Sequence, residues 1–218
     1  MNRDRLAALC GVAAPTVAIG SILLATVIAS TETFTWRDRA LSHMGEAGTE
    51  TFVLFNGGLV VAGLVGIPFG WLLWREARNR LERLGVGLLA AAVVGLVGVG
   101  VFFIGHDSYY LPVDLHAPAA LVVFLGAPVA ALLHAAGLRR EGDGTAARIT
   151  ALLGVSHFIT WIVWVAAVGG SESMPWFAVP EMVAALLFAA WIYYLAIPRL
   201  AGGDAAAPGR STPTQRLS

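Results

Sequence analysis

The chain has 218 residues, of which 57% are hydrophobic and 13% charged, and its formal net charge is zero. A soluble domain carries about 25% charged residues, so this chain has too little polar surface to form a water-soluble globule. The balanced charge gives no overall field that favours nucleic acid or an acidic partner. The single cysteine, Cys10, excludes an intramolecular disulfide and a cysteine-based metal site.

Six apolar stretches are each long enough to cross a bilayer. A helix rises about 1.5 Å per residue, so about 20 residues span a hydrocarbon core of about 30 Å. The stretches predict an all-α bundle of six transmembrane helices, in one domain of residues 1–200, with a disordered cytoplasmic tail over residues 201–218. The predicted spans are Leu6–Ala29, Phe52–Trp74, Leu84–Ile104, Ala117–Leu138, Ile149–Val168 and Phe177–Ile197.

Arginine is distributed unevenly between the connections of the predicted spans. Twelve of the fourteen arginines lie before the first span, in the second-to-third and fourth-to-fifth connections, or after the sixth span. The remaining connections contain only Arg37 and Arg39. The positive-inside rule therefore predicts a multi-pass protein of the cell membrane with both termini in the cytoplasm.

Glycines recur inside the second and third spans and predict close helix packing. Small residues let helix backbones approach each other where no hydrophobic effect drives association. Two packing partners are compatible with them, a neighbouring helix of the same chain or a second copy in a homo-oligomer. These glycines are Gly63, Gly66, Gly70, Gly87, Gly95, Gly98 and Gly100.

The predicted outer connections carry most of the other polar side chains. The first outer connection contains Trp36 and is expected to form an interfacial loop, or a short helix that lies on or dips into the outer interface. The third-to-fourth connection, residues 106–116, has two histidines and two aspartates within eleven residues. Zinc binds imidazole and carboxylate, and a catalytic zinc takes about three protein ligands and a water. We therefore consider a zinc site made of His43, His106 and His116.

The same residues have a structural interpretation, which stays open from the sequence alone. In that interpretation Asp114 caps the fourth helix, and Tyr109 and Tyr110 lie at the level of the lipid headgroups. The spacing of His106 and His116 matches no established metal-binding motif, so ligand type is the main argument for a metal.

A few polar side chains are expected inside the spans. Polar and ionisable groups there usually face the bundle interior and mark functional sites. If they converge at the outer face, His116, His106, Asp107 and Glu181 form a candidate catalytic group, because a carboxylate beside an imidazole supports general acid–base chemistry. A wider polar pocket would add Ser42, Asn56 and His157. The alternative for His157 is a neutral ring that makes a hydrogen bond between helices.

Short motifs indicate a family. The run from Leu41 to Gly45 (Leu-Ser-His-Met-Gly), the run from Phe55 to Leu59 (Phe-Asn-Gly-Gly-Leu) and the pair Ala62-Gly63, followed by Pro112 and His116, resemble a prokaryotic six-helix membrane family catalogued as domain of unknown function 998. The resemblance extends from about Leu6 to Ile197 and implies a fold without an established activity. The chain is more distantly similar to six-helix proteins of lipid remodelling, including the GPI-anchor maturation factors.

Three functions remain open. The first is a membrane protein that binds lipid or isoprenoid without chemistry of its own. The second is a membrane-embedded, metal-dependent hydrolase that modifies lipid at the outer leaflet. The third is a small transporter, although transporters usually have polar groups at broken helices near the midplane.

Overall fold

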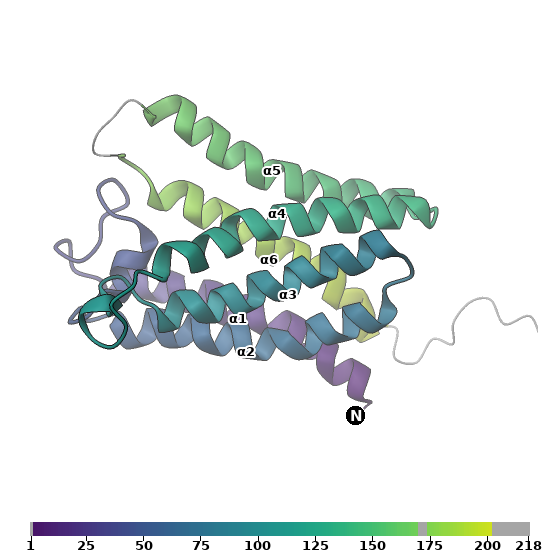
Figure 1. Ribbon diagram of the computed structural model, residues 1–218, viewed down its shortest axis with the longest axis horizontal. Coiled ribbons are helices and arrows are strands. Elements are labelled where there is room, and N and C mark those ends of the chain that lie inside the picture. The colour runs from purple at the N-terminus through teal and green to yellow at the C-terminus, as the bar shows by residue number, and fades with distance from the viewer. Residues whose placement is uncertain (1, 170–173, 202–218) are drawn as a thin grey trace, which may run out of the picture.

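Six long helices form most of the described part of the chain. The computed structural model describes residues 2–169 and 174–201 (Figure 1). All six long helices are long and apolar enough to span a membrane, which confirms the predicted all-α, multi-pass membrane fold. The predicted tail lies outside the described residues except for its first residue, Ala201. The helices are α1 (Arg3–Ile28), α2 (Phe52–Glu76), α3 (Arg80–Val101), α4 (His116–Arg140), α5 (Gly144–Val168) and α6 (Ala178–Ala201), with two 3-10 helices, η1 (Leu41–Gly45) and η2 (His106–Ser108).

The helices run up and down along one axis, so the connections gather at two ends (Figure 1). The start of α1, the end of α6 and the α2–α3 and α4–α5 connections share one end, which we call the arginine-rich end. The opposite end carries η1 and η2, and we call it the histidine-rich end. Helix α5 lies at the edge of the bundle, against α4 and α6.

Helix α3 differs most from its predicted span. It begins at Arg80 because the side-chain oxygen of Asn79 accepts hydrogen bonds from the backbone N–H groups of Leu81 and Glu82, both at 3.0 Å. Such a cap satisfies donors that have no partner within the helix. The helix ends at Val101, before the predicted Ile104, and a turn follows in which Gly105 has a φ of 81°.

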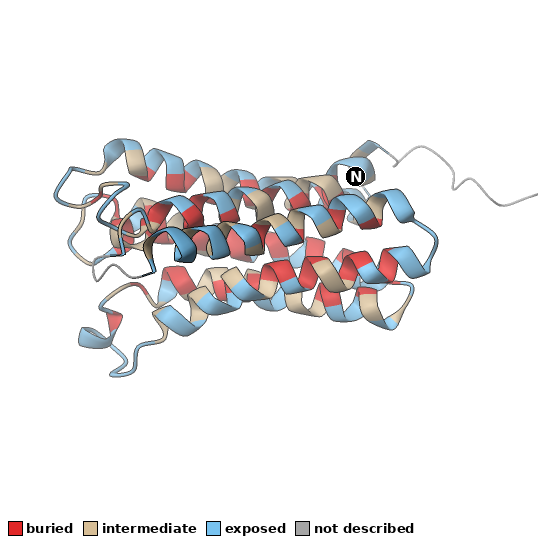
Figure 2. Cartoon of the chain, turned by 90° about the horizontal axis from the view of Figure 1, so that it is seen from above, coloured by how far each residue is buried: buried red, intermediate tan, exposed pale blue. Residues whose placement is uncertain are grey.

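Each long helix has one buried face and one exposed face. Buried residues face the middle of the bundle along its whole length, and exposed ones face outward (Figure 2). Many outward-facing residues are large and apolar, such as Val27, Leu64 and Leu152. This pattern is expected for a protein surrounded by lipid, where apolar side chains are stable on the outer surface.

Glycines bring α3 close to its neighbours within the same chain. A Cβ atom at Gly85 would lie 2.7 Å from the backbone nitrogen of His134 on α4, and one at Gly100 would lie 2.6 Å from the backbone oxygen of Asn56 on α2. Gly63 and Gly95 also face a neighbouring helix closely. These glycines therefore serve packing inside the protomer, and the homo-oligomer remains a prediction.

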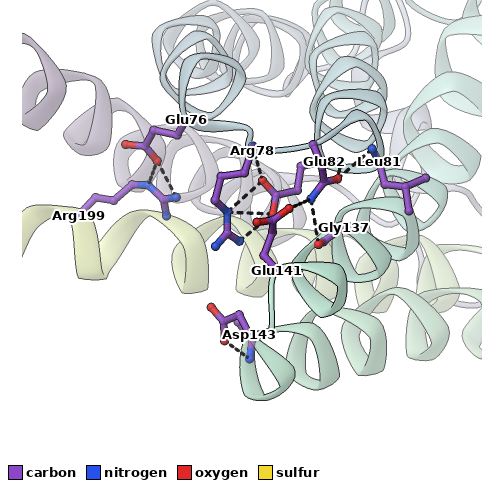
Figure 3. A network of polar contacts seen from close by, with 10 residues as sticks. Glu76, Arg78, Leu81, Glu82, Gly137, Glu141, Asp143 and Arg199 are labelled. Carbon is purple, nitrogen blue, oxygen red and sulfur yellow. Dashed lines mark hydrogen bonds and ion pairs between the residues drawn. The ribbon is translucent and has the colours of Figure 1, made fainter. Parts of the chain in front are cut away.

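A polar network closes the arginine-rich end (Figure 3). Arg78 donates to the carboxylate of Glu82 with an N···O distance of 2.7 Å, and only 3% of the Glu82 side chain is exposed. Asn79 donates to the Gly137 carbonyl at 3.1 Å and to Glu141 at 2.9 Å, which joins the α2–α3 connection to the end of α4. The Glu82 carboxylate raises the pKa of Arg78, so this guanidinium remains charged.

Hydrogen bonds to the Glu50 carboxylate hold the connection between α1 and α2, and they make the stability of the fold depend on pH. The backbone N–H of Ser30, with the N–H of Glu50 itself and the hydroxyl of Thr33, lowers the pKa of Glu50 from 4.5 to about 2. A carboxylate with a depressed pKa stabilises the fold above its unfolded pKa and loses that contribution as pH falls to the folded pKa. We therefore expect Glu50→Gln to be less sensitive than wild type to acidification from pH 4.5 to about 2.

Thermal unfolding in mild detergent, recorded across this pH window, measures the effect. Glu46→Gln is the control, because Glu46 is an exposed carboxylate of the same connection. Parallel curves for wild type and Glu50→Gln would show that the Glu50 bonds do not stabilise the fold.

Candidate functional site

The first connection at the histidine-rich end folds into the bundle. In η1, residues 41–45, which we call the η1 plug, Leu41, Met44 and Gly45 are buried among the helices. A short helix is one of the two predicted forms, and its burial agrees with a segment that dips inward from the end of the bundle. Met44 is completely buried, because its side chain joins the cluster around Phe55 and Leu59.

Three side chains fix the η1 plug through its backbone. Thr51 donates its hydroxyl to the Met44 carbonyl at 2.7 Å, and Asn56 donates its amide to the Gly45 carbonyl at 2.8 Å. Glu181, near the start of α6, accepts the backbone N–H of Leu41 at 2.6 Å. All three side chains are buried. They therefore supply hydrogen-bond partners to backbone groups of the η1 plug that water does not reach.

Below the η1 plug an axial cavity of about 120 Å³ lies among the helices. Its lining extends along α2 from Phe55 to Gly70, which is about 22 Å at 1.5 Å per residue. Small residues create this space. Gly70 is buried, yet a Cβ atom there would have no neighbour within 4 Å, so Gly70 faces open volume. Ala184 and Ala189 on α6 also line the cavity.

The lining is apolar except at four residues. Ser42 in the η1 plug, His116 at the start of α4 and Glu181 on α6 lie at the histidine-rich end, and His157 lies halfway along α5. These four belong to the predicted site residues, and the structure brings them to one cavity. The axial cavity is therefore an apolar channel, and Ser42, His116 and Glu181 form a polar cap at its histidine-rich end.

Glu181 is the buried carboxylate of the cap. It is 6% exposed, and no basic side chain in the described part of the chain forms an ion pair with it. At this end, Arg37 lies 3.9 Å from Asp38, and Arg39 is exposed.

His116 has one ring nitrogen committed to the protein. Its Nδ1 lies 2.7 Å from the Phe102 carbonyl oxygen, which can only accept, so Nδ1 carries the proton. In the neutral ring, Nε2 is then an acceptor. The backbone N–H of His116 donates to Asp114 at 2.9 Å, in agreement with the capping role expected for Asp114.

His157 is the polar group in the middle of the channel. It is 3% exposed, and its Nε2 has no hydrogen-bond partner within the described residues. Its ring packs beside Phe124, with the centroids 6.5 Å apart, and Phe124 packs against Trp161 at 5.2 Å. His157 therefore lines the cavity, and its Nε2 makes no hydrogen bond to another helix within the described residues.

The other predicted site residues lie away from the cavity lining. Both ring nitrogens of His106 are within 3.0 Å of carbonyl oxygens, those of Phe103 and Val113, so the ring is used to hold its own loop. Asp107 is exposed. The amide of Asn56 is committed to the η1 plug.

A zinc site gains no support from these positions. His43 accepts the backbone N–H of Ala40 at Nδ1, 3.0 Å away, and burial lowers the pKa of His43 below its ordinary value. Within residues 2–169 and 174–201, no three His, Cys, Asp or Glu side chains form a group that could hold a metal ion. The zinc ligands His43, His106 and His116 therefore stay a prediction from the sequence.

Comparison with known proteins gives one match. The model of the family described as "Protein of unknown function (DUF998)" matches residues 12–198, which is most of the chain, and confirms the resemblance of the short motifs. No curated protein and no solved structure matches the chain. The functional argument therefore rests on the geometry of the cavity.

Proposed function

The chain belongs to this family of proteins of unknown function, and we propose from its geometry that it binds a single-chain amphiphile in the axial cavity. The apolar chain of the ligand would occupy the channel between α1, α2 and α6. Its polar head would lie at the cap formed by Ser42, His116 and Glu181. The observation that carries this proposal is an apolar cavity that ends in three polar side chains.

The length of the cavity lining is sufficient for one lipid chain. One leaflet accounts for half of a hydrocarbon core of about 30 Å, and the channel lining covers about 22 Å. Apolar cavities of about 150 Å³ stay dry and take up apolar molecules, so a cavity of about 120 Å³ favours hydrocarbon over water.

The position of the cap suggests the side of the membrane. The arginine distribution predicts that the histidine-rich end is outside, and the head of the ligand would then lie at the outer leaflet. The hydrolase and transporter hypotheses gain less from the geometry. Asp107 and His106 do not line the cavity, and the single polar residue of the lining outside the cap is His157.

Binding of radiolabelled dodecanol to the protein in phosphatidylcholine nanodiscs tests the proposal. We expect saturable binding of about one molecule per chain, above the partitioning into empty nanodiscs. Gly70→Leu should weaken this binding at least tenfold, because the new side chain occupies the channel. Leucine also has the higher helix propensity, so α2 should remain folded.

Gly20→Leu is the matched control. Gly20 is exposed on α1, and a Cβ atom there would also meet no neighbour within 4 Å, but it does not line the cavity. This variant should bind dodecanol as wild type does. Absence of saturable binding to wild type, or equal loss in both variants, would refute binding in the axial cavity.

A further inference from the structure

We propose that the head of the bound amphiphile is a primary ammonium, so that the ligand is a long-chain amine. This inference rests on the proposed amphiphile binding and adds the chemical class of the head. It follows from the charge and the hydrogen-bonding groups that the cap presents to the cavity. A primary alkylamine resembles the lysine side chain, whose pKa is about 10.4, so its head is cationic at pH 7.

Charge is the first argument. A buried carboxylate is stable in its ionised form only when a cation or several donors compensate it. Glu181 receives one backbone N–H, from Leu41, through Oε2. Its Oε1 makes no hydrogen bond within the described residues, and no described cation pairs with it. Without such a partner a buried carboxyl group is neutral, and a ligand cation at the cap would supply the partner that makes the ionised form of Glu181 stable.

Donor number is the second argument. An ammonium group has three N–H donors and no acceptor. The three residues of the cap carry one acceptor each that the protein leaves free, Oε1 of Glu181, the hydroxyl oxygen of Ser42 and Nε2 of His116. The Ser42 hydroxyl makes no hydrogen bond to another described residue, and the bond from Nδ1 of His116 to Phe102 leaves Nε2 with its lone pair. An alcohol head has one donor and would leave acceptors unused.

Support of the η1 plug does not by itself require a charged group at Glu181. If Glu181 served the protein alone, a neutral acceptor would hold the Leu41 N–H equally well. Gln provides such an acceptor with nearly the same shape. Glu181→Gln therefore separates the support of the η1 plug from the recognition of a cation.

The test compares three ligands of equal chain length, dodecylamine, dodecanol and dodecanoate, at pH 7 in phosphatidylcholine nanodiscs, each corrected for empty nanodiscs. Wild type should bind dodecylamine at least tenfold more tightly than dodecanol, with dodecanoate weakest. In Glu181→Gln the affinity for dodecylamine should fall to that for dodecanol, so that the preference of the protein for the amine is lost.

Each outcome has one meaning. Equal binding of the amine and the alcohol by wild type would overturn the ammonium assignment and leave amphiphile binding intact. Preference for the amine that survives in Glu181→Gln would also overturn it. Failure of all three ligands to bind wild type would instead refute the proposed function. The ranking in wild type needs no variant, so it decides the question even if Glu181→Gln does not fold.

Discussion

Gly85→Ala is expected to destabilise the bundle by about 3 kcal/mol or more. The added Cβ atom would lie 2.7 Å from the backbone nitrogen of His134, 2.8 Å from the Ala130 carbonyl oxygen and 3.0 Å from the His134 Cα. All three atoms belong to the backbone of α4, so no side-chain rotation relieves the overlap. Overpacking a rigid contact costs about 1–3 kcal/mol, and here two long helices must separate along their common face.

Gly87→Ala provides the control on the same helix. A Cβ atom at Gly87 would meet the Trp74 ring at 3.5 Å, an ordinary contact. Alanine is preferred over glycine in a helix by about 0.5–1 kcal/mol, so this variant should be as stable as wild type or more stable. The two variants are compared by thermal unfolding in the same detergent. If Gly85→Ala unfolds at the wild-type temperature, the close approach of α3 and α4 is not as described.

The sequence predicts the helices well because each span is a long, local signal. Hydrophobicity over about 20 residues is sufficient to identify a transmembrane helix, whatever its partners are. The predicted span Phe52–Trp74 begins at the residue where α2 begins, and the prediction for α5 ends where the helix ends, at Val168. The remaining differences are at helix ends, where single residues such as Asn79 decide the boundary by capping.

The η1 plug shows what the sequence leaves undetermined. Leu41 and Met44 are apolar residues of a short connection, a pattern equally typical of a segment on the membrane surface. Their burial depends on acceptors and donors far along the chain. Leu41 is bound by Glu181, which is 140 residues away. No local pattern encodes such a contact, so the sequence alone does not distinguish a segment that lies on the outer interface from one that dips into it.

The candidate site residues lie in two kinds of place. Ser42, His116, His157 and Glu181 line the cavity, in agreement with the rule that polar groups next to or inside a span usually face the interior. Nearness in sequence was a poor guide for His106, whose ring turns back to the carbonyl groups of its own loop. The cavity itself is formed by small residues, whose short or missing side chains leave space between the helices. From the sequence, Gly70 is interpreted as a residue of close helix packing. The structure shows instead that a Cβ atom at Gly70 would have no neighbour within 4 Å.

Arg78→Ala should cost about 3 kcal/mol of stability, because it leaves a charge buried without a partner. The Glu82 carboxylate is 3% exposed and accepts hydrogen bonds from Arg78 at distances of 2.7 and 3.2 Å, and from the Arg78 backbone N–H at 2.8 Å. Removing one member of a buried ion pair typically costs 3–5 kcal/mol, most of it the unpaired charge. Because the Arg78 side chain is exposed, water screens the ion pair, and we expect a loss of stability at the lower end of this range.

A second substitution identifies the cause of this loss. In the double variant Arg78→Ala with Glu82→Gln, the buried group is neutral, so most of the lost stability should return. Arg83→Ala controls for the loss of an arginine from the same helix end, because Arg83 is exposed and forms no ion pair within the described residues. It should change stability by no more than about 0.5 kcal/mol. Equal losses in Arg78→Ala and Arg83→Ala would mean that the arginines act at the membrane surface, and that the Glu82 pair does not hold the arginine-rich end together.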